Sequence, residues 1–447
     1  MNSLDNYMKV ANCHTGEIDG YGYAFASGNR NGVMLLDLRT KRLLDDLSIF
    51  QNEKDEKRID ILIKRKLIHL KNRPIYYLPI SRSVIKSIGI WLHVTNNCNL
   101  DCDYCYITNK KDKRSMTIET ANLFLSKLEN TVKQHNLKFI QIKFAGGEPT
   151  MNKKVIIFIA DEVQKRFVDN GIFIQLRLIT NGTLLDSKWI KLLKTYSIGF
   201  CISLDGVRKW NDATRPYKNG AGSFKQIHKN LKMCMEEGLQ PGILTTITEE
   251  NIEGIPLLSR FLIDLNLRFR YAVYRDNSGN YKKYESFIDK LMYPLDDCYD
   301  YYDKAIREQK AFFSHQLADI HLDKKPHFKS CNIGYSGLII NHVGKMFLCQ
   351  AGMNKLSIGC LTDKKTLLQI MWNQKTLPDL YKKNVLEYNK CKECKWALSC
   401  GGGCSLINLS ANGSTNTSSP YCKLFKKMIP RLIKLKALQI IQTSLKI

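Results

Sequence analysis

The residues best suited to chemistry in this chain are cysteines, and three of them stand close together. Cys98, Cys102 and Cys105 lie within eight residues of sequence, directly after a predicted strand that ends at Val94. Three thiolates on such a loop can hold three irons of a 4Fe–4S cluster and leave the fourth iron open to a small molecule. Structural zinc is the alternative, but it takes four closed ligands and usually two paired knuckles. The spacing therefore favours an iron–sulfur cluster with one open iron.

Polar motifs follow the next three predicted strands. They are Gly146-Gly147-Glu148-Pro149, then Thr180-Asn181-Gly182, then Ser203-Leu204-Asp205-Gly206. Together with C-x3-C-x2-C, whose last cysteine follows the aromatic Tyr104, these motifs resemble those of the radical S-adenosylmethionine superfamily. The resemblance covers roughly residues 89–275, and four motifs in the same order make it specific.

The resemblance implies a site for S-adenosylmethionine, whose amino and carboxylate groups would bind the open iron. Glycines would let the backbone approach the ligand, Glu148 would accept from its ammonium group, and Arg215 is similar to an arginine that pairs with its carboxylate. A surface ion pair for Arg215, and strand-end caps for Asn181 and Ser203, are the alternatives. The implied cofactor-binding residues are Tyr104, Gly146, Gly147, Glu148, Asn181, Ser203, Asp205 and Arg215.

A second set of cysteines fills the last third of the chain. Seven of them resemble the SPASM extension of radical enzymes that modify peptides and proteins, which implies two auxiliary 4Fe–4S clusters and three in total. One would be fully ligated by Cys391, Cys394, Cys400 and Cys422, and the other would be held by Cys331, Cys349 and Cys404.

The second of these clusters lacks an obvious fourth ligand. Some members have a further cysteine just before the first, but residues 322–330 contain none. The cluster then has an open iron, or takes Asp323, His327 or a substrate atom. A zinc ribbon using Cys391 and Cys394 is the alternative. Cys201, in a predicted strand, and Cys234, on a predicted helix, are expected to be buried thiols.

Strands alternating with helices must position the first cysteine loop. Strands are predicted over 89–94, 138–144, 172–180, 198–204, 242–248 and 268–275, and helices over 117–134, 153–170, 186–196, 223–237 and 255–265. Six β/α units place their motifs at the carboxyl ends of parallel strands. The expected fold class is α/β: a partial (β/α)6 barrel with a small N-terminal α+β module and a loop-rich C-terminal iron–sulfur domain.

The chain divides into six predicted segments. They are a peptide-recognition-like module over 1–75, a linker over 76–88, the radical SAM barrel over 89–280, a helical connection over 281–330, the auxiliary-cluster domain over 331–425 and a C-terminal helix over 426–447. That basic amphipathic helix favours packing on the core over lying on a membrane surface.

The N-terminal module reads as a hairpin followed by two helices. Extended runs at 20–25 and 32–37 flank the turn dipeptide Asn31-Gly32, and helical patterns follow over 40–50 and 55–68. The module weakly resembles units that bind a leader peptide by strand addition, with residues 57–72 as its final helix. A purely structural cap is the alternative.

Composition excludes several classes of protein. Among 447 residues, 44% are hydrophobic and 10% aromatic, which excludes disorder. No apolar run is long enough to cross a bilayer, and the first residues lack a secretory pattern, so a cytoplasmic protein is expected. The net charge of +26 would suit nucleic acid, an anionic membrane or an acidic peptide. The lysines are spread along the whole chain, which favours a solvated surface and no nucleic-acid partner.

The predicted function is formation of a 5′-deoxyadenosyl radical that takes a side-chain hydrogen from a precursor peptide and forms an intramolecular crosslink. The expected partners are that peptide and an electron donor such as flavodoxin or ferredoxin. An anaerobic sulfatase maturase is the rival enzyme, disfavoured by Gln350 where that group typically has Asp. A non-enzymatic zinc or metal protein is the rival from another class. The general base stays open among Tyr104, Tyr106, Asp276 and the Tyr/Asp-rich segment after residue 281.

Overall fold

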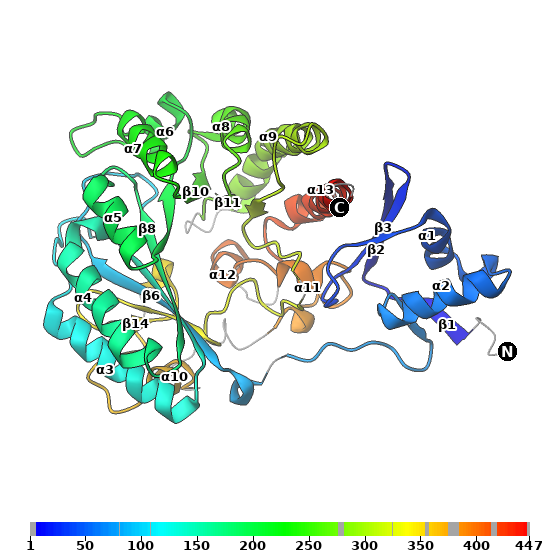
Figure 1. Cartoon of the computed structure of the whole chain (residues 1–447), viewed down its shortest axis with the longest axis horizontal. Coiled ribbons are helices and arrows are strands. Elements are labelled where there is room, and N and C mark those ends of the chain that lie inside the picture. The colour runs from blue at the N-terminus through cyan, green and yellow to red at the C-terminus, as the bar shows by residue number, and fades with distance from the viewer. Residues whose placement is uncertain are drawn as a thin grey trace.

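A single ten-stranded sheet forms the centre of the protein (Figure 1). The computed structural model describes residues 6–79, 81–107, 109–275, 281–323, 325–353, 357–373, 384–412 and 418–444. The strand order is β12-β11-β10-β9-β8-β7-β6-β13-β14-β15. The central six strands are parallel neighbours in chain order, namely β6 (Ser87–Thr95), β7 (Phe139–Gly146), β8 (Phe173–Thr180), β9 (Gly199–Ser203), β10 (Gly242–Ile247) and β11 (Phe269–Val273). The expected α/β fold with a parallel sheet is confirmed, and each predicted strand agrees within a residue or two.

Helices cover one face of these strands, as Figure 1 shows. They are α3 (Ile118–His135), α4 (Lys153–Val163), α5 (Ser187–Thr195), α6 (Lys209–Thr214), α7 (Phe224–Glu236) and α8 (Ile255–Asp264). Ile140, Ile142 and Phe144 alternate along β7, are fully buried and belong to the same core as Phe124 of α3. The intervening β7 residues face the other way. We call that opposite side, which α3–α8 do not cover, the inner face.

Four further strands extend the sheet beyond the six β/α units. On one edge, β12 (His315–Leu317) pairs parallel with β11. On the other edge, β13 (Gly337–Ile340) pairs parallel with β6, and β14 (Lys345–Phe347) and β15 (Gly359–Cys360) continue antiparallel. The sequence predicted none of the four. They tie the segments on either side of Cys331 to both edges of the sheet.

The N-terminal module differs from its prediction in both hairpin and helix. β2 (Cys13–Ile18) and β3 (Tyr21–Ala26) form a tight hairpin, and Asp19 and Gly20 at its turn have φ of 50° and 80°. These values fit the Asp-Gly dipeptide, a stronger turn signal here than Asn31-Gly32. The predicted pairing of 20–25 with 32–37 also exists, between β3 and β4 (Met34–Leu36), but a longer loop joins them.

The last predicted helix of this module ends early. α1 (Leu38–Asp45) and α2 (Glu53–Lys64) form, but Lys66 adopts a left-handed φ of 55° that ends the helical path. Residues Ile68–Leu70 are β5, paired with β1 (Tyr7–Lys9), so the expected helix over 57–72 is wrong in its second half. The module has a core of its own and also contacts the C-terminal region, where the Ser27 and Ser399 hydroxyls are 2.8 Å apart.

The C-terminal third combines two long helices with short ones. α9 (Tyr281–Arg307) and α13 (Cys422–Ser444) pack together, and α10 (Leu367–Met371), α11 (Ala397–Cys400) and α12 (Ser405–Asn412) lie between them in sequence. Leu424, Met428, Leu432 and Leu438 of α13 are buried, which confirms packing on the core. Among the described residues, the helices all lack the length and apolar character needed to span a bilayer.

Candidate functional site

The loop that carries Cys98, Cys102 and Cys105 leaves β6 and is held against the end of β7. The Gly147 amide donates to the Thr95 carbonyl at 2.7 Å, and the Glu148 amide donates to the Asn97 carbonyl at 2.7 Å. A Cβ at Gly146 or Gly147 would lie 2.3 Å from the Thr95 or Asn97 oxygen, and Gly146 has a φ of 141°. The two glycines are therefore required for the loop to approach β7 so closely.

Glu148 ties the ends of β7 and β8 together. Its carboxylate is fully buried and accepts four hydrogen bonds, from the Thr150 amide, the Thr150 hydroxyl, the Thr180 hydroxyl and the Asn181 amide, at 2.6–3.0 Å. Burial raises the pKa of this carboxyl, while the four donors oppose that rise. One lone pair of Oε2 is left over from these bonds.

Asn181 connects the end of β8 to the cysteine loop. Its Nδ2 donates to Asn99 Oδ1 at 2.9 Å and approaches Cys98 Sγ at 3.9 Å, and its Oδ1 accepts from the Thr183 amide and hydroxyl. The side chain thus acts on the loop rather than only capping β8. Ser203, at the end of β9, is half-buried, and its hydroxyl bonds to none of the described residues.

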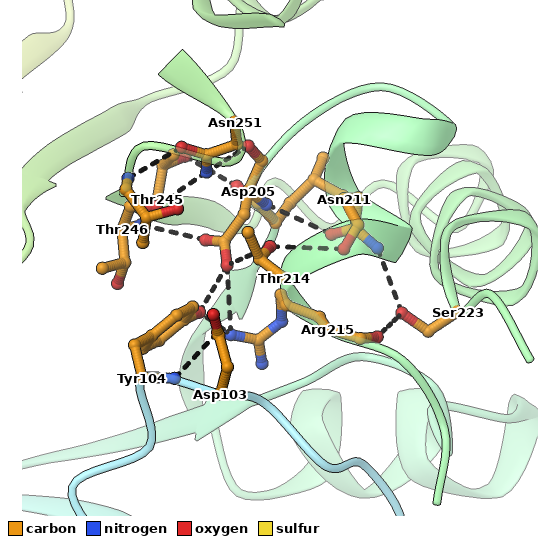
Figure 2. A network of polar contacts seen from close by, with 12 residues as sticks. Asp103, Tyr104, Asp205, Asn211, Thr214, Arg215, Ser223, Thr245, Thr246 and Asn251 are labelled. Atoms are coloured by element: carbon orange, nitrogen blue, oxygen red, sulfur yellow. Dashed lines mark hydrogen bonds and ion pairs between the residues drawn. The ribbon is translucent and has the colours of Figure 1, made fainter. Parts of the chain in front are cut away.

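A buried network joins the loop to the ends of β9 and β10 (Figure 2). The Tyr104 hydroxyl donates to Asp205 Oδ2, and the Arg215 guanidinium donates to the same hydroxyl and lies 3.7 Å from Asp205. Asp205 also accepts from the Thr246 amide at 2.9 Å and from the Thr214 hydroxyl. Figure 2 shows Tyr104 and Arg215 converging on one carboxylate.

Arg215 keeps unused donor capacity inside this network. The residue is only 8% exposed, and its Nε is buried and bonds to none of the described residues. A buried guanidinium nitrogen without an acceptor costs free energy, so an anionic group at this position would satisfy it. The surface ion pair that the sequence left open for Arg215 is wrong, because the side chain is buried.

The three thiols of the loop share one environment. Burial raises the pKa of Cys98 to about 11, with smaller contributions from Glu148 and Cys102. Burial also raises the pKa of Cys102, and Cys105 adds to that rise while Arg215 opposes it. These mutual influences place the thiols beside one another and beside the Arg215 network. Thiols crowded in this way fit metal ligation, which requires the deprotonated form.

Four of the C-terminal cysteines gather in one group. Burial raises the pKa of Cys400 to about 12, with smaller contributions from the charges of Cys391, Cys394 and Cys422. Turns place the first two, since the Cys394 amide donates to the Cys391 carbonyl at 3.0 Å. The structure therefore brings together the four residues that the resemblance assigned to one cluster.

The other three cysteines form a separate group around Cys404. Cys331 is open to solvent on one side, yet the protein around its thiol raises the pKa to about 12, with smaller contributions from Cys404, Asp319 and Cys349. A small pocket is lined by Arg275, Asp319 and Cys404, among others, and Arg275 pairs with Asp319 at 3.4 Å. Asp319 is the carboxylate that lies next to this group.

Asp323 and His327 have other partners. His327 Nε2 lies 2.5 Å from Asp323, and the rings of His327 and His321 stack with centroids 3.8 Å apart. Parallel rings at this spacing cannot both direct an in-plane lone pair at one ion, so the trio does not form a metal site in this arrangement. Asp319 is a candidate fourth ligand that the sequence did not reveal. Only its position shortly before Cys331 could have pointed to it.

Three glycines separate the two cysteine groups. Gly401, Gly402 and Gly403 all have positive φ, between 57° and 78°, and a Cβ at Gly401 would lie 2.2 Å from the Lys329 backbone. This turn carries the chain from Cys400 in one group to Cys404 in the other. The run of glycine between two cysteines was the sequence signal for it.

The remaining candidate residues differ from one another in burial and in their contacts. Cys234 is fully buried as expected, but Cys201 is half-buried and faces the inner side of the sheet. The Tyr106 hydroxyl donates to the Gly146 carbonyl at 3.3 Å, which places Tyr106 near the cysteine loop. Asp276 lies outside the described residues. His93, on β6 and fully buried, is a neighbour of Tyr106 that the sequence did not single out.

One protein family matches the part of the chain that carries the first cysteine loop and strands β7–β10. Residues 92–262 match the Radical SAM superfamily. The chain carries a radical SAM domain. A cysteine-type anaerobic sulfatase-maturating enzyme of Clostridium novyi (strain NT) is 27% identical over 78% of this chain and 96% of its own length.

Two solved structures resemble the fold of this chain. One is anSMEcpe with bound AdoMet, at a TM-score of 0.64 and 20% identity over 78% of this chain and 98% of the other. The second is Streptococcus suis SuiB bound to the precursor peptide SuiA. Its TM-score is 0.54, and it is 16% identical over 92% of this chain and 98% of its own. Since residues 89–447 make up about four fifths of the chain, the match to SuiB extends into the N-terminal module.

Proposed function

We propose that this protein is a radical SAM enzyme that forms an intramolecular crosslink in a precursor peptide. The observation that carries the proposal is the convergence of three thiols, buried Glu148 and the under-used Arg215 at the ends of β6–β9. Parallel strands of a partial (β/α)6 barrel place such groups at one mouth. The match to the Radical SAM superfamily supports the same site.

The residues at this mouth fit the cofactors. Cys98, Cys102 and Cys105 would hold a 4Fe–4S cluster with one open iron. When bound there, the cluster and S-adenosylmethionine supply a one-electron cleavage that yields a 5′-deoxyadenosyl radical. Arg215 would pair with the methionine carboxylate through its unsatisfied nitrogen, and Asn181 and Asp205 would fix the position of the bound molecule.

Glu148 then has a positioning task. Its carboxylate fixes the ends of β7 and β8, and one lone pair of Oε2 stays available for the ammonium group of S-adenosylmethionine. Tyr104 joins the cysteine loop to Asp205 and Arg215, so a bound ligand that draws on Arg215 also acts on the loop. The network orients the ligand relative to the three thiols.

The C-terminal cysteines would hold two further clusters, as in a SPASM domain. The grouping of Cys391, Cys394, Cys400 and Cys422 on one side, and Cys331, Cys349 and Cys404 on the other, supports this assignment. In the crosslinking reaction the 5′-deoxyadenosyl radical would take one hydrogen atom from the peptide, an auxiliary cluster would accept one further electron, and a base would take the proton. The product therefore lacks a pair of hydrogen atoms relative to the precursor.

The N-terminal module supports a peptide as the substrate. β2 and β4 are the edges of its three-stranded sheet, and an extended leader segment can add to such an edge. The likeness of the fold to SuiB, whose structure holds a precursor peptide, includes part of this module. Electrons would come from a small donor such as flavodoxin or ferredoxin.

Oxidation of a sulfatase side chain is the second candidate, favoured by the relative from Clostridium novyi. Gln350 directly follows Cys349, where maturases of that group typically have Asp, and an amide cannot serve as a general base. The presence of the N-terminal module also favours the crosslinking reaction.

The proposal is tested with anaerobically reconstituted full-length protein. It should be brown, and with dithionite and S-adenosylmethionine it should release 5′-deoxyadenosine, detected by liquid chromatography and mass spectrometry. A colourless protein with bound zinc would contradict the proposal. With the peptide encoded beside the gene, tandem mass spectrometry should find a product that lacks two hydrogen atoms and resists fragmentation between the linked residues.

A further inference from the structure

The inner face of the sheet carries a group of cations near which the described residues place one carboxylate, Asp319, whose charge opposes the lowering of the Arg270 pKa by burial. Lys143 on β7, Arg177 on β8 and Arg270 on β11 occupy inner-face positions, and Arg268 directly precedes β11 with the same parity. Among the described residues, none accepts a hydrogen bond from these four side chains or forms an ion pair with them. We call these four residues the inner-face cations.

These cations lie close together around one thiol. Lys143 and Arg177 are register partners on neighbouring parallel strands, so their side chains stand next to each other. Burial, together with the charges of Arg270 and Arg177, lowers the pKa of Lys143. The charges of Arg177, Lys143, Arg268 and Arg270 all oppose the rise in pKa that burial gives Cys201. The four cations therefore converge on the part of the inner face where Cys201 lies.

Small residues leave room for this arrangement. Gly199 is the register partner of Arg177, and a Cβ there would lie 2.6 Å from Arg177 Nη1. Gly242 pairs with Cys201, and a Cβ there would lie 3.0 Å from the Cys201 sulfur. At these two positions the sheet presents only backbone beside the cations, while Cys201, Ser203 and Leu244 supply the neighbouring side chains of the inner face.

The arrangement has no structural benefit of its own. Like charges placed side by side on neighbouring strands destabilise a sheet, and the partial burial of Lys143 and Arg177 adds a desolvation cost for those two. Arg275, by contrast, is paired with Asp319 beside the group of Cys331, Cys349 and Cys404. Lys143 lies on β7 and Arg177 on β8. In the sheet, β9 and β10 lie between these two strands and β11. A need to balance charge near Cys331 therefore does not account for them.

We propose that the inner-face cations bind acidic side chains of the peptide substrate. This inference rests on the proposed function, since it assumes that a peptide enters between the sheet and the C-terminal region. Carboxylates of Asp or Glu supply the charge that four unpaired cations lack, and Arg177, Arg268 and Arg270 can each bind one in a two-pronged geometry.

The position of the cations fixes where the acidic residues stand. Lys143 precedes Gly146 by three residues and Arg177 precedes Thr180 by three, which is about 10 Å along a strand. An extended peptide covers the same distance in about three residues. For a peptide that runs along the strands with its reacting residue at the strand ends, the acidic residues lie about three positions from that residue.

Binding of defined peptides to the reconstituted full-length protein tests this inference. The probe is fluorescein-labelled GGEEEGG with an amidated C-terminus, and its GGQQQGG counterparts carry either an amide or a free carboxylate. Anisotropy should show that K143Q/R177Q weakens binding of the Glu probe about tenfold or more, whereas K188Q/K191Q on the outer helix α5 changes it less than about twofold. Both doubles remove two positive charges. Lys188 and Lys191 are exposed.

A second readout places the probe on the inner face. The Glu probe should slow alkylation of Cys201 by iodoacetamide, while Cys360, which donates to Asp363 at 3.2 Å, should react at its usual rate. Equal weakening by the two doubles would mean general attraction to a basic surface and would overturn the inference. So would binding of the free-carboxylate Gln peptide as tightly as the Glu probe, or unchanged alkylation of Cys201. Release of 5′-deoxyadenosine without any peptide tests the proposed function separately.

Discussion

The two cysteine-bearing regions of this molecule are built in different ways. The loop of Cys98, Cys102 and Cys105 follows a long central strand and is fixed by backbone bonds to Gly147 and Glu148. The C-terminal groups draw on residues spread from 331 to 422, placed by turns, short helices and three glycines with positive φ. The first site is formed by the sheet, whereas the second depends more on whatever its thiols bind.

This difference predicts a large contrast in amide exchange when iron is removed. In apo protein, prepared with a chelator and kept reduced, amides across 385–412 should exchange roughly a hundredfold faster or more, because the backbone bonds of that segment are mostly those of turns and short helices. Amides of β6–β10 should keep their protection. Hydrogen exchange with mass spectrometry measures both regions in one sample. Equal loss of protection in the two regions would show that both depend on metal to the same extent, which would contradict the expected difference.

Replacing Glu148 tests the rigidity of the first region. Glu148→Gln leaves one carbonyl oxygen for four donors and turns an amide donor toward them. We expect a loss of about 3 kcal/mol or more in the free energy of unfolding, measured by urea denaturation of the apo protein. Glu236→Gln, which removes an exposed partner of Lys232, serves as the control and should cost less than about 0.5 kcal/mol. Similar losses in both variants would argue against the role of Glu148.

The pH dependence of stability separates the regions further. Burial lowers the pKa of His93 to about 4, with the charge of His342 acting in the same direction and Asp112 opposing it. Unfolded His titrates near 6.5, so between pH 6.5 and 4 the unfolded chain binds a proton that the folded chain does not. Stability therefore falls with falling pH in this window, by up to about 3 kcal/mol, and His93→Gln should flatten the curve.

His321 provides the matching test in the C-terminal region. Burial lowers its pKa to about 4 as well. If the C-terminal region is disordered without metal, His321→Gln should leave the curve of the apo protein unchanged. If His321→Gln flattens the curve of stability against pH as much as His93→Gln does, the C-terminal region folds without metal.

The smallest expected effect is spectroscopic and concerns the group of three cysteines. Asp319→Asn should shift the electron paramagnetic resonance of one reduced auxiliary cluster, because this carboxylate lies beside Cys331 and Cys404. Asp323→Asn, which loosens the contacts to His327 and Lys325, should leave that spectrum unchanged. The spectra are compared in protein whose first cysteine loop has been replaced by alanine. The reverse pattern would assign the fourth position to the Asp323 pair.

Sequence patterns predicted the first region better than the second for a physical reason. Strand and helix periodicity defines β6–β11 within a residue or two, and strand ends bring Glu148, Asn181 and Asp205 together in any parallel sheet. The bond between Tyr104 and Arg215 depends on tertiary packing that spacing does not encode. In the C-terminal region, the family resemblance implied the two groups of cysteines, but not β12–β15 or the place of Asp319. These features depend on contacts between distant segments.

The N-terminal module shows the same limit on a smaller scale. Its hairpin turn at Asp19-Gly20 was readable from the dipeptide, whereas Ile68–Leu70 reads as the end of a helix and forms a strand because β1 supplies a partner. Cys201 is a further case, since a mid-strand thiol is ordinarily buried by helices and here faces the inner side.

We infer that the first region carries out the radical chemistry and the second does not. Two variants test it directly, one with Cys98, Cys102 and Cys105 replaced by Ala and one with Cys391, Cys394, Cys400 and Cys422 replaced by Ala. Each should keep about two thirds of the wild-type iron, which shows that the other clusters assemble. The first should release no 5′-deoxyadenosine from S-adenosylmethionine, and the second should still release it. Cleavage that persists in the first variant, or is lost in the second at that iron content, would contradict the account.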